Sequence, residues 1–255
     1  MAWDPDVYLA FAAERTRPAR ELLARIDVSA PQTIADLGCG PGNSTALLAA
    51  RWPNAALVGI DSSAEMLDAA RASAVPAQWC QADLTAWQPK TRYDVLFSNA
   101  TLQWIGDHAR VLPKLMQTLA AGGTLAVQMP RNFDQPSHTL IRSIATGKAW
   151  AHCFDSVQDA SHVCSPEQYF QILEPHAHRI DLWETIYVQV LDGEDAVYHW
   201  MSGTSLRPFA QALAEPARTE FLDAYRAALA RAYPRRASGA TLFAFRRLFI
   251  VATAR

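Results

Sequence analysis

The sequence has 255 residues, 50% of them hydrophobic, and a formal net charge of -2 at pH 7. This is enough chain for one substantial core, and the near-neutral charge argues against a nucleic-acid partner. No apolar run is as long as the roughly 18 residues that a membrane helix needs, and the N-terminus shows no signal-peptide pattern. The four cysteines contain no C-x-x-C pair. We therefore expect a cytoplasmic protein with reduced cysteines.

The first half of the chain alternates short apolar runs with helical patterns. A helical pattern covers Pro5–Arg25, in which Pro18 is expected to begin a second helix. Alternating strands and helices predict a parallel sheet with helices on both faces. The elements expected next are the strand Thr33–Leu37, the helix Ser44–Arg51, the strand Ala56–Ile60, the helix Ala64–Ala72, the strands Gln78–Gln81 and Tyr93–Ser98, the helix Ala109–Ala120 and the strand Thr124–Gln128.

The pattern changes after Pro130. The elements expected there are helices at Pro136–Thr146, Pro166–Leu173 and Ala217–Tyr233 and strands at Ile180–Val190 and Leu242–Ala252. We therefore predict an α/β fold: a Rossmann-like, doubly wound, mostly parallel seven-stranded sheet with an antiparallel edge hairpin and a helical cap. Residues 1–255 would form a single domain, with an N-terminal helical lid (1–30), a cofactor-binding core (31–130), and cap insertions with C-terminal edge strands (131–255).

A glycine-rich turn follows the first expected strand. Gly38, Gly40 and Gly42 read G-x-G-x-G, and Asn43 opens the next helical pattern. Glycine permits positive φ and lets a ligand approach the backbone closely. The carboxylate of Asp36, two residues before the turn, suits a cationic ligand group and would repel a pyrophosphate. This segment resembles the first motif of S-adenosylmethionine (SAM) dependent methyltransferases.

Further candidate cofactor residues follow the next three strands, at the same edge of the predicted sheet. Asp61 can accept both ribose hydroxyls, and Met66 can cover an adenine face. Asp83 can accept the adenine amino group. Each has a structural alternative: Asp61 or the following serines, Ser62 and Ser63, as a helix N-cap, Asp83 as a turn residue, and Met66 in the core. The predicted cofactor contacts beyond the turn are Asp61, Ser62, Met66, Asp83, Leu84 and Asn99.

A family resemblance extends over nearly the whole sequence and is carried by the segments Trp3–Ala19, Leu102–Trp104, Ala126–Pro130, Leu206–Pro208 and Arg247–Ala252. With these segments the sequence resembles trans-aconitate methyltransferases, which esterify one carboxylate of a small tricarboxylic acid. The resemblance is weakest over Gly147–Cys164. At two positions the sequence departs from the family pattern: Arg131 stands where an acid is expected, and Ser205 where a glycine is expected.

The resemblance implies carboxyl O-methylation with SAM as cofactor and S-adenosylhomocysteine (SAH) as product. A carboxylate is already ionised at pH 7, so no catalytic base is expected. Arginines should bind the acceptor, because the guanidinium fork matches a carboxylate. Arg15 and Arg246 are further candidates, although Arg246 and Arg247 point to opposite faces of a strand. The predicted acceptor contacts are Arg17, Gln103, Trp104, Arg207 and Arg247.

Three other functions are open at this point. One is O-methylation of a malonyl group on a carrier protein or on CoA, the second is a NAD-dependent oxidoreductase, and the third is a non-catalytic SAM-binding module. Asp36 and the glycine spacing argue against the oxidoreductase. We expect no metal site, since His152, Cys153, His162 and Cys164 lack a zinc-binding spacing. We also expect a monomer without a membrane partner.

Overall fold

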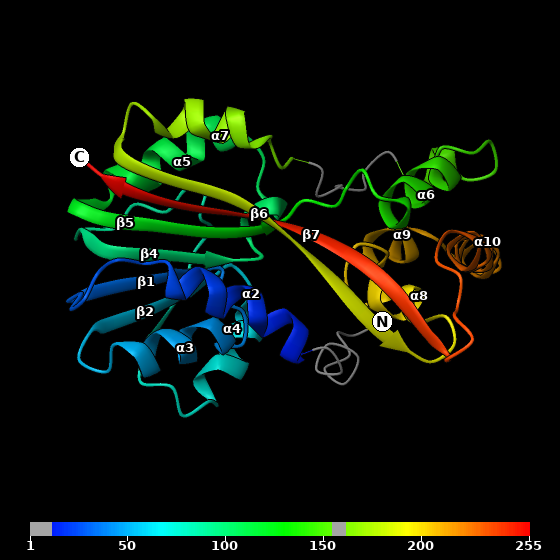
Figure 1. Ribbon diagram of the computed structural model, residues 1–255, viewed down its shortest axis with the longest axis horizontal. Helices are drawn as coiled ribbons and strands as arrows, with labels where there is room; N and C mark the ends of the chain where they lie inside the picture. The colour runs from blue at the N-terminus through cyan, green and yellow to red at the C-terminus, as the bar shows by residue number, and fades with distance from the viewer. Residues whose placement is uncertain (1–11, 155–161) are drawn as a thin grey trace. The chain divides into compact units, whose positions relative to one another are not determined.

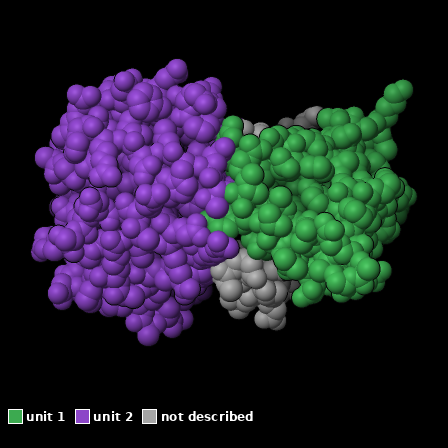
Figure 2. Space-filling view, in the orientation of Figure 1, with its two compact units in different colours: residues 1–14, 131–161, 186–246 green, residues 15–130, 162–185, 247–255 purple. Residues whose placement is uncertain are grey.

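The computed structural model of the protein describes residues 12–154 and 162–255, with side chains from Thr16 onward. It divides into two compact units (Figure 2). Unit 2 comprises residues 15–130, 162–185 and 247–255, and unit 1 includes residues 131–154 and 186–246. Each unit has its own hydrophobic cluster of buried side chains.

A seven-stranded sheet has the strand order β3-β2-β1-β4-β5-β7-β6 (Figure 1). Strands β1 to β5 pair in parallel, and β7 runs antiparallel to β5. The predicted α/β fold, with a mostly parallel sheet and an antiparallel edge, is therefore confirmed. The strands are β1 (Thr33–Leu37), β2 (Ala56–Asp61), β3 (Gln78–Gln81), β4 (Tyr93–Asn99), β5 (Leu119–Pro130), β6 (Ala177–Asp192) and β7 (Ala240–Ala254).

The apolar runs in the centre of the sheet are buried because helices cover them. In β4, Val95 and Phe97 are fully buried. Asp36 of β1 is the partner of Gly59 in β2 and of Phe97 in β4, so the carboxyl ends of these three strands reach the same edge. The sequence-predicted residues that follow these strands are thereby gathered at one edge of unit 2.

The helices of unit 2 flank this sheet. Helix α5 packs against both α7 and β5 (Figure 1). Helix α3 packs against β2, and α4 packs against β2 and β3. Their bounds are α2 (Ala12–Ala24), α3 (Asn43–Arg51), α4 (Ala64–Arg71), the 3₁₀ helix η1 (Leu102–Trp104), α5 (His108–Gln117) and α7 (Pro166–Leu173).

Two predicted boundaries in unit 2 are wrong. Helix α2 continues through Pro18, although an interior proline removes one helix hydrogen bond. The buried side chains of Leu22 and Leu23 offset that loss. The helix predicted over Ala109–Ala120 ends at Gln117, and β5 begins two residues later, because Leu119 already pairs with Tyr93 across an irregularity in the β4–β5 register.

Unit 1 contains the helices between residues 131 and 154, after β5, and those between residues 193 and 239, after β6. Tyr225 is fully buried, and its hydroxyl donates to the Ser137 carbonyl at 2.6 Å, which ties α10 to α6. Three of these helices, η2, α8 and α9, lie outside the predicted elements. The helices are α6 (Pro136–Ala145), the 3₁₀ helix η2 (Ala151–Cys153), α8 (Ala196–Ser202), α9 (Arg207–Ala212) and α10 (Ala217–Ala232). In the part of the chain that the structure describes, no helix is long and apolar enough to cross a membrane.

Candidate active site

The glycine turn between β1 and α3 depends on glycine for two different reasons. Gly38, Gly40 and Gly42 all have positive φ, at 71°, 54° and 93°. A Cβ on Gly38 would lie 2.0 Å from Cγ2 of Thr101, so the backbone must approach the segment after β4 closely. A Cβ on Gly40 would meet nothing within 4 Å. Gly40 therefore leaves one face of the turn open to a ligand.

Asp36 is a fully buried carboxylate at the end of β1. Its Oδ2 accepts hydrogen bonds from the hydroxyls of Ser44 and Thr45, each at 2.7 Å. Its Oδ1 is buried and has no hydrogen-bond partner among the described residues. Burial raises the pKa of Asp36 to about 6, although the two hydroxyls oppose that shift. A buried carboxylate with one unpartnered oxygen suits a cationic ligand, which fits the predicted cofactor.

Asp61 supports the glycine turn from the end of β2. Its Oδ2 accepts from the Gly40 amide and its Oδ1 from the Ser63 amide, both at 2.9 Å. The N-cap of α4 is Ser63, whose hydroxyl accepts from the Met66 amide at 3.2 Å, so Asp61 is not the cap. Because a carboxylate can accept about four hydrogen bonds, Asp61 retains capacity for ribose hydroxyls. Met66 is partly buried, on the first turn of α4.

Asp83 has the structural role that was weighed as its alternative. Its Oδ1 accepts from the amide and the hydroxyl of Thr85, both at 2.8 Å, and these bonds hold the pKa of Asp83 below its usual value. Adenine recognition by Asp83 stays a prediction.

The remaining predicted cofactor residues differ in burial. The Oδ1 of Asn99, at the end of β4, is buried without a partner among the described residues. Leu84 packs at the margin of the unit 2 core, while Ser62 and Asn43 are exposed.

The segment after β4 is held in an unusual conformation. Ala100 has φ 55°, a left-handed value that costs a residue with a Cβ about 1–2 kcal/mol. Its amide donates to the Gln128 carbonyl at 2.9 Å, and its carbonyl accepts from Nε2 of Gln103 at 2.7 Å. The other polar atom of this side chain, Oε1 of Gln103, is buried and has no hydrogen-bond partner among the described residues. Trp104, the next residue, is 46% exposed.

Arg247 is buried on the strand that pairs with β5. It is 5% exposed, and its Nη1 donates to Oε1 of Gln128 at 3.2 Å. Arginine can only donate, so this contact fixes the amide orientation of Gln128. The Nε2 of Gln128, also buried, has no partner among the described residues. Gln128 thus presents a donor beside a guanidinium, close to the turn that Ala100 anchors.

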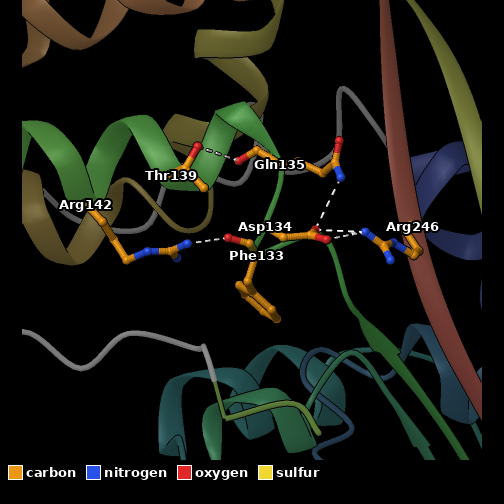
Figure 3. Close-up of polar contacts among 6 residues, drawn as sticks. All are labelled: Phe133, Asp134, Gln135, Thr139, Arg142 and Arg246. Atoms are coloured by element: carbon orange, nitrogen blue, oxygen red, sulfur yellow. Dashed lines mark hydrogen bonds and ion pairs between the residues drawn. The ribbon is translucent and has the colours of Figure 1, made fainter. Parts of the chain in front are cut away.

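Arg246 lies on the opposite face of β7 and has a different partner. Its Nη2 reaches both carboxylate oxygens of Asp134, at 2.8 and 2.6 Å, within unit 1 (Figure 3). The Phe133 carbonyl beside it accepts from Arg142 (Figure 3). Asp134 therefore already neutralises Arg246, the candidate that shares a strand with Arg247.

The remaining arginine candidates have no comparable burial. Arg17 forms an exposed ion pair with Glu21, with 2.9 Å between Nε and Oε1. Arg207 is exposed at the start of α9 in unit 1. The side chain of Arg15 and the motif over Trp3–Phe11 lie outside the described residues.

Both departures from the family pattern make contacts within unit 1. The hydroxyl of Ser205, in the expected glycine position, bonds to Nε2 of His138 at 3.1 Å. Burial lowers the pKa of His138 to about 4, so it does not titrate near neutral pH. The amide of Arg131 donates to the Arg246 carbonyl at 2.9 Å. Among the described residues, no group of three His, Cys, Asp or Glu side chains is arranged to hold a metal ion.

Sequence reasoning missed Gln128 and Thr101 as site residues. Gln128 is a polar residue inside the apolar run Ala126–Pro130, and such an interruption of a buried strand was a usable signal. Thr101 gave no signal, because its contact with Gly38 joins residues that are distant in the sequence: its hydroxyl donates to the Gly38 carbonyl at 3.0 Å.

The chain is similar to known methyltransferases. A family model described as "Methyltransferase domain" matches residues 34–123. A trans-aconitate 2-methyltransferase from Azoarcus sp. (strain BH72) is 50% identical over 250 residues, covering 98% of each chain. One from Rhodopseudomonas palustris (strain BisB5) is 45% identical over 251 residues, again covering 98% of each.

Solved structures show the same fold at low sequence identity. The YcgJ protein from Bacillus subtilis has a TM-score of 0.60 and 13% identity, covering 94% of this chain and 98% of that chain. Phosphoethanolamine N-methyltransferase 2 from Haemonchus contortus, in complex with S-adenosyl-L-methionine, has a TM-score of 0.53 and 14% identity, covering 94% of this chain and 53% of that chain. With relatives at 45 to 50% identity over nearly its full length, the chain belongs to the trans-aconitate 2-methyltransferase family.

Proposed function

We propose that the protein is a SAM-dependent carboxyl O-methyltransferase that forms a methyl ester on trans-aconitate. The observation that carries the choice of acceptor is the buried guanidinium of Arg247 beside the unpartnered Nε2 of Gln128. Both side chains carry N–H groups, and a carboxylate is acceptor-only, so a guanidinium and an amide side by side suit it. The names of relatives at up to 50% identity support the same acceptor.

The cofactor would be held at the carboxyl edge of β1, β2 and β4. Asp36 supplies negative charge for a cationic methionyl group, Gly40 leaves space at the turn, and Asp61 offers acceptors to ribose hydroxyls. SAM supplies an electrophilic methyl group on a sulfonium centre. The further residues proposed to contact it are Gly38, Gly42, Asn43, Ser62, Met66, Asp83, Leu84 and Asn99.

The chain's own task toward the acceptor is to bind, orient and dehydrate it. A carboxylate is ionised at pH 7, so no residue needs to remove a proton. Arg247 and Gln128 would grip a carboxylate, while Gln103 and Trp104 would form the wall that excludes water from the reacting oxygen. Contacts of Arg17 and Arg207 with the acceptor are part of the proposal, as are a monomeric state and a cytoplasmic location.

The test combines a substrate panel with a matched pair of variants. Purified protein and methyl-labelled SAM are incubated with trans-aconitate, related di- and tricarboxylates and malonyl-CoA, and the esters are identified by mass spectrometry. Arg247→Lys keeps the charge but loses the fork. The KM for trans-aconitate should rise at least tenfold, since a hydrogen bond to a charged group is worth about 1.5–3 kcal/mol.

The control is Arg246→Lys on the opposite face of β7, which should leave that KM near the wild-type value. SAH affinity, measured by calorimetry, should be unchanged in both variants. Faster methylation of malonyl-CoA than of trans-aconitate, or an unchanged KM in Arg247→Lys, would contradict the proposed acceptor or its grip.

A further inference from the structure

Four groups of unit 2 form a continuous chain of hydrogen bonds that ends at η1, and three of them belong to buried residues. The Cys164 amide donates to the Tyr169 hydroxyl at 3.1 Å, and that hydroxyl lies 2.6 Å from Nδ1 of His108. The other ring nitrogen of His108, Nε2, lies 2.8 Å from the Leu102 carbonyl. Tyr169 and Leu102 are fully buried, and His108 is 3% exposed.

The chemistry of the two ends fixes the direction of every proton in this chain. A carbonyl oxygen only accepts, so Nε2 of His108 carries the proton and donates to Leu102. Burial lowers the pKa of His108 below its usual value, so the imidazole is neutral at pH 7 and Nδ1 is an acceptor. The Tyr169 hydroxyl then donates to Nδ1 at 2.6 Å, a much closer acceptor than Sδ of Met129 at 4.0 Å, and its oxygen accepts from the Cys164 amide.

The carbonyl that receives this chain belongs to the first residue of η1. It also accepts from the Ile105 amide at 2.9 Å, the bond that closes the 3₁₀ turn. The next two residues are Gln103 and Trp104, the proposed wall of the acceptor site. Fixing the Leu102 carbonyl from two sides therefore restricts the backbone that carries both side chains.

We propose that His108 and Tyr169 are positioning residues, which hold η1 in the conformation that presents Gln103 and Trp104 to the acceptor. The inference rests on the proposed function, since it takes η1 to face the methyl acceptor. Neither residue touches the reacting atoms. Their effect is transmitted through the backbone of this turn, where Nε2 of His108 contacts the Leu102 carbonyl.

Two replacements of His108 separate positioning from packing. Glutamine extends to the depth of Nε2 and can still donate to Leu102, whereas asparagine reaches only the depth of Nδ1 and cannot. In His108→Asn, the Trp104 and Ile105 amides should exchange with deuterium about fivefold faster, the factor that corresponds to about 1 kcal/mol. His108→Gln should restore slow exchange. This readout requires no acceptor.

Activity gives the second readout. His108→Asn should lower kcat for trans-aconitate about tenfold or more, because small misplacements at a reacting centre are costly, while SAH affinity stays within about twofold. His108→Gln should recover most of the loss, and Tyr169→Phe should fall between the two. The control is His178→Ala, which removes another imidazole bonded to a backbone carbonyl, since Nδ1 of His178 lies 3.0 Å from the Ala254 carbonyl oxygen. It should change neither readout.

The outcomes distinguish this inference from the proposed function. If wild-type protein does not methylate trans-aconitate but His108→Asn still speeds exchange in η1 and His108→Gln reverses it, the proposed function fails and the fixing of η1 stands. If His108→Asn leaves exchange and kcat at wild-type values, or if His108→Gln is as impaired as His108→Asn, the positioning role is overturned. Thermal unfolding of each variant identifies one that fails to fold, in which case Tyr169→Phe decides by the same two readouts.

Discussion

At the scale of single residues, Asp36 combines a cost to folding with a use in binding. Its folded-state pKa of about 6 exceeds the ordinary 3.8, so the folded protein binds this proton more tightly than the unfolded chain. The free energy of unfolding should therefore increase as pH falls from about 6 to about 4. Above pH 6, the buried charge destabilises the fold by about 3 kcal/mol, an order-of-magnitude figure from about 1.4 kcal/mol per pKa unit.

Asp36→Asn removes this charge with little change in shape. We expect the variant to be more stable than wild type at pH 7 and to lose that advantage near pH 4. We also expect it to bind both SAM and SAH more weakly. Urea unfolding at both pH values and calorimetry with SAH measure the three effects. Equal stability of the two proteins at both pH values would show that Asp36 is not desolvated in the folded state.

The residues of the site differ in how far the sequence reveals them. Asp36, Gly38 and Asp61 stand in one local pattern, so their placement at a strand edge could be predicted. His108 and Tyr169 could not, because their bond joins residues 61 apart in sequence and neither belongs to a motif. The sequence does not distinguish Arg247 from the other candidate arginines. Only the pairing of β5 with β7 shows that it lies beside Gln128.

At the scale of elements, the glycine turn offers two substitutions that differ only in available space. Gly38→Ala and Gly40→Ala both impose positive φ on alanine, which costs about 1–2 kcal/mol. At Gly38 the new Cβ would also collide with Thr101, adding about 1–3 kcal/mol for overpacking. Gly38→Ala should therefore lower the thermal unfolding midpoint by clearly more than Gly40→Ala.

Binding should rank these variants by a different criterion. Gly40→Ala should remain folded but lose affinity for SAH, because its Cβ enters the open face of the turn. Differential scanning fluorimetry and calorimetry test the pair together. Equal destabilisation by both substitutions would contradict the close approach of Gly38 to Thr101, and unaltered SAH affinity in Gly40→Ala would place the ligand elsewhere.

The elements that could be predicted are those with a clear period and clear ends. The strands over Thr33–Leu37 and Gln78–Gln81 and the helix Pro166–Leu173 have the expected bounds, and the helix carries a capping box at Ser165. The short helices α8 and α9 span too few residues for their periodicity to stand out. Tertiary packing overrode the local pattern at Pro18.

At the scale of the whole molecule, the two separate buried clusters lead us to expect that a bound ligand protects the two units from hydrogen exchange to different extents. One cluster draws only on residues of unit 2 and the other only on residues of unit 1. All proposed cofactor residues belong to unit 2. A ligand stabilises what it binds, by about 2.7 kcal/mol at about 100 times its Kd. SAH should therefore raise protection in β4 of unit 2 far more than in α10 of unit 1.

Hydrogen exchange followed by mass spectrometry measures both elements in one experiment. Peptides from Tyr93–Asn99 and Ala217–Ala232 report on the two units, with and without saturating SAH. The Asp36→Asn protein, with its weakened binding, serves as the control and should show a smaller difference between the units. Equal gains in protection in both peptides would mean that the chain unfolds as one cooperative body.

The strand order also bears on how the chain is made. β7 follows every other strand in the sequence, yet it lies between β5 and β6 in the sheet. During synthesis, β6 leaves the ribosome before its neighbour in the sheet, β7, has been translated. The backbone groups of β6 that pair with β7 therefore stay unpaired until β7 is made. A message that ends after α10 would therefore cost the sheet two strands and remove Arg247 as well. Completion of the described sheet and completion of the proposed acceptor site thus depend on the same strand, β7.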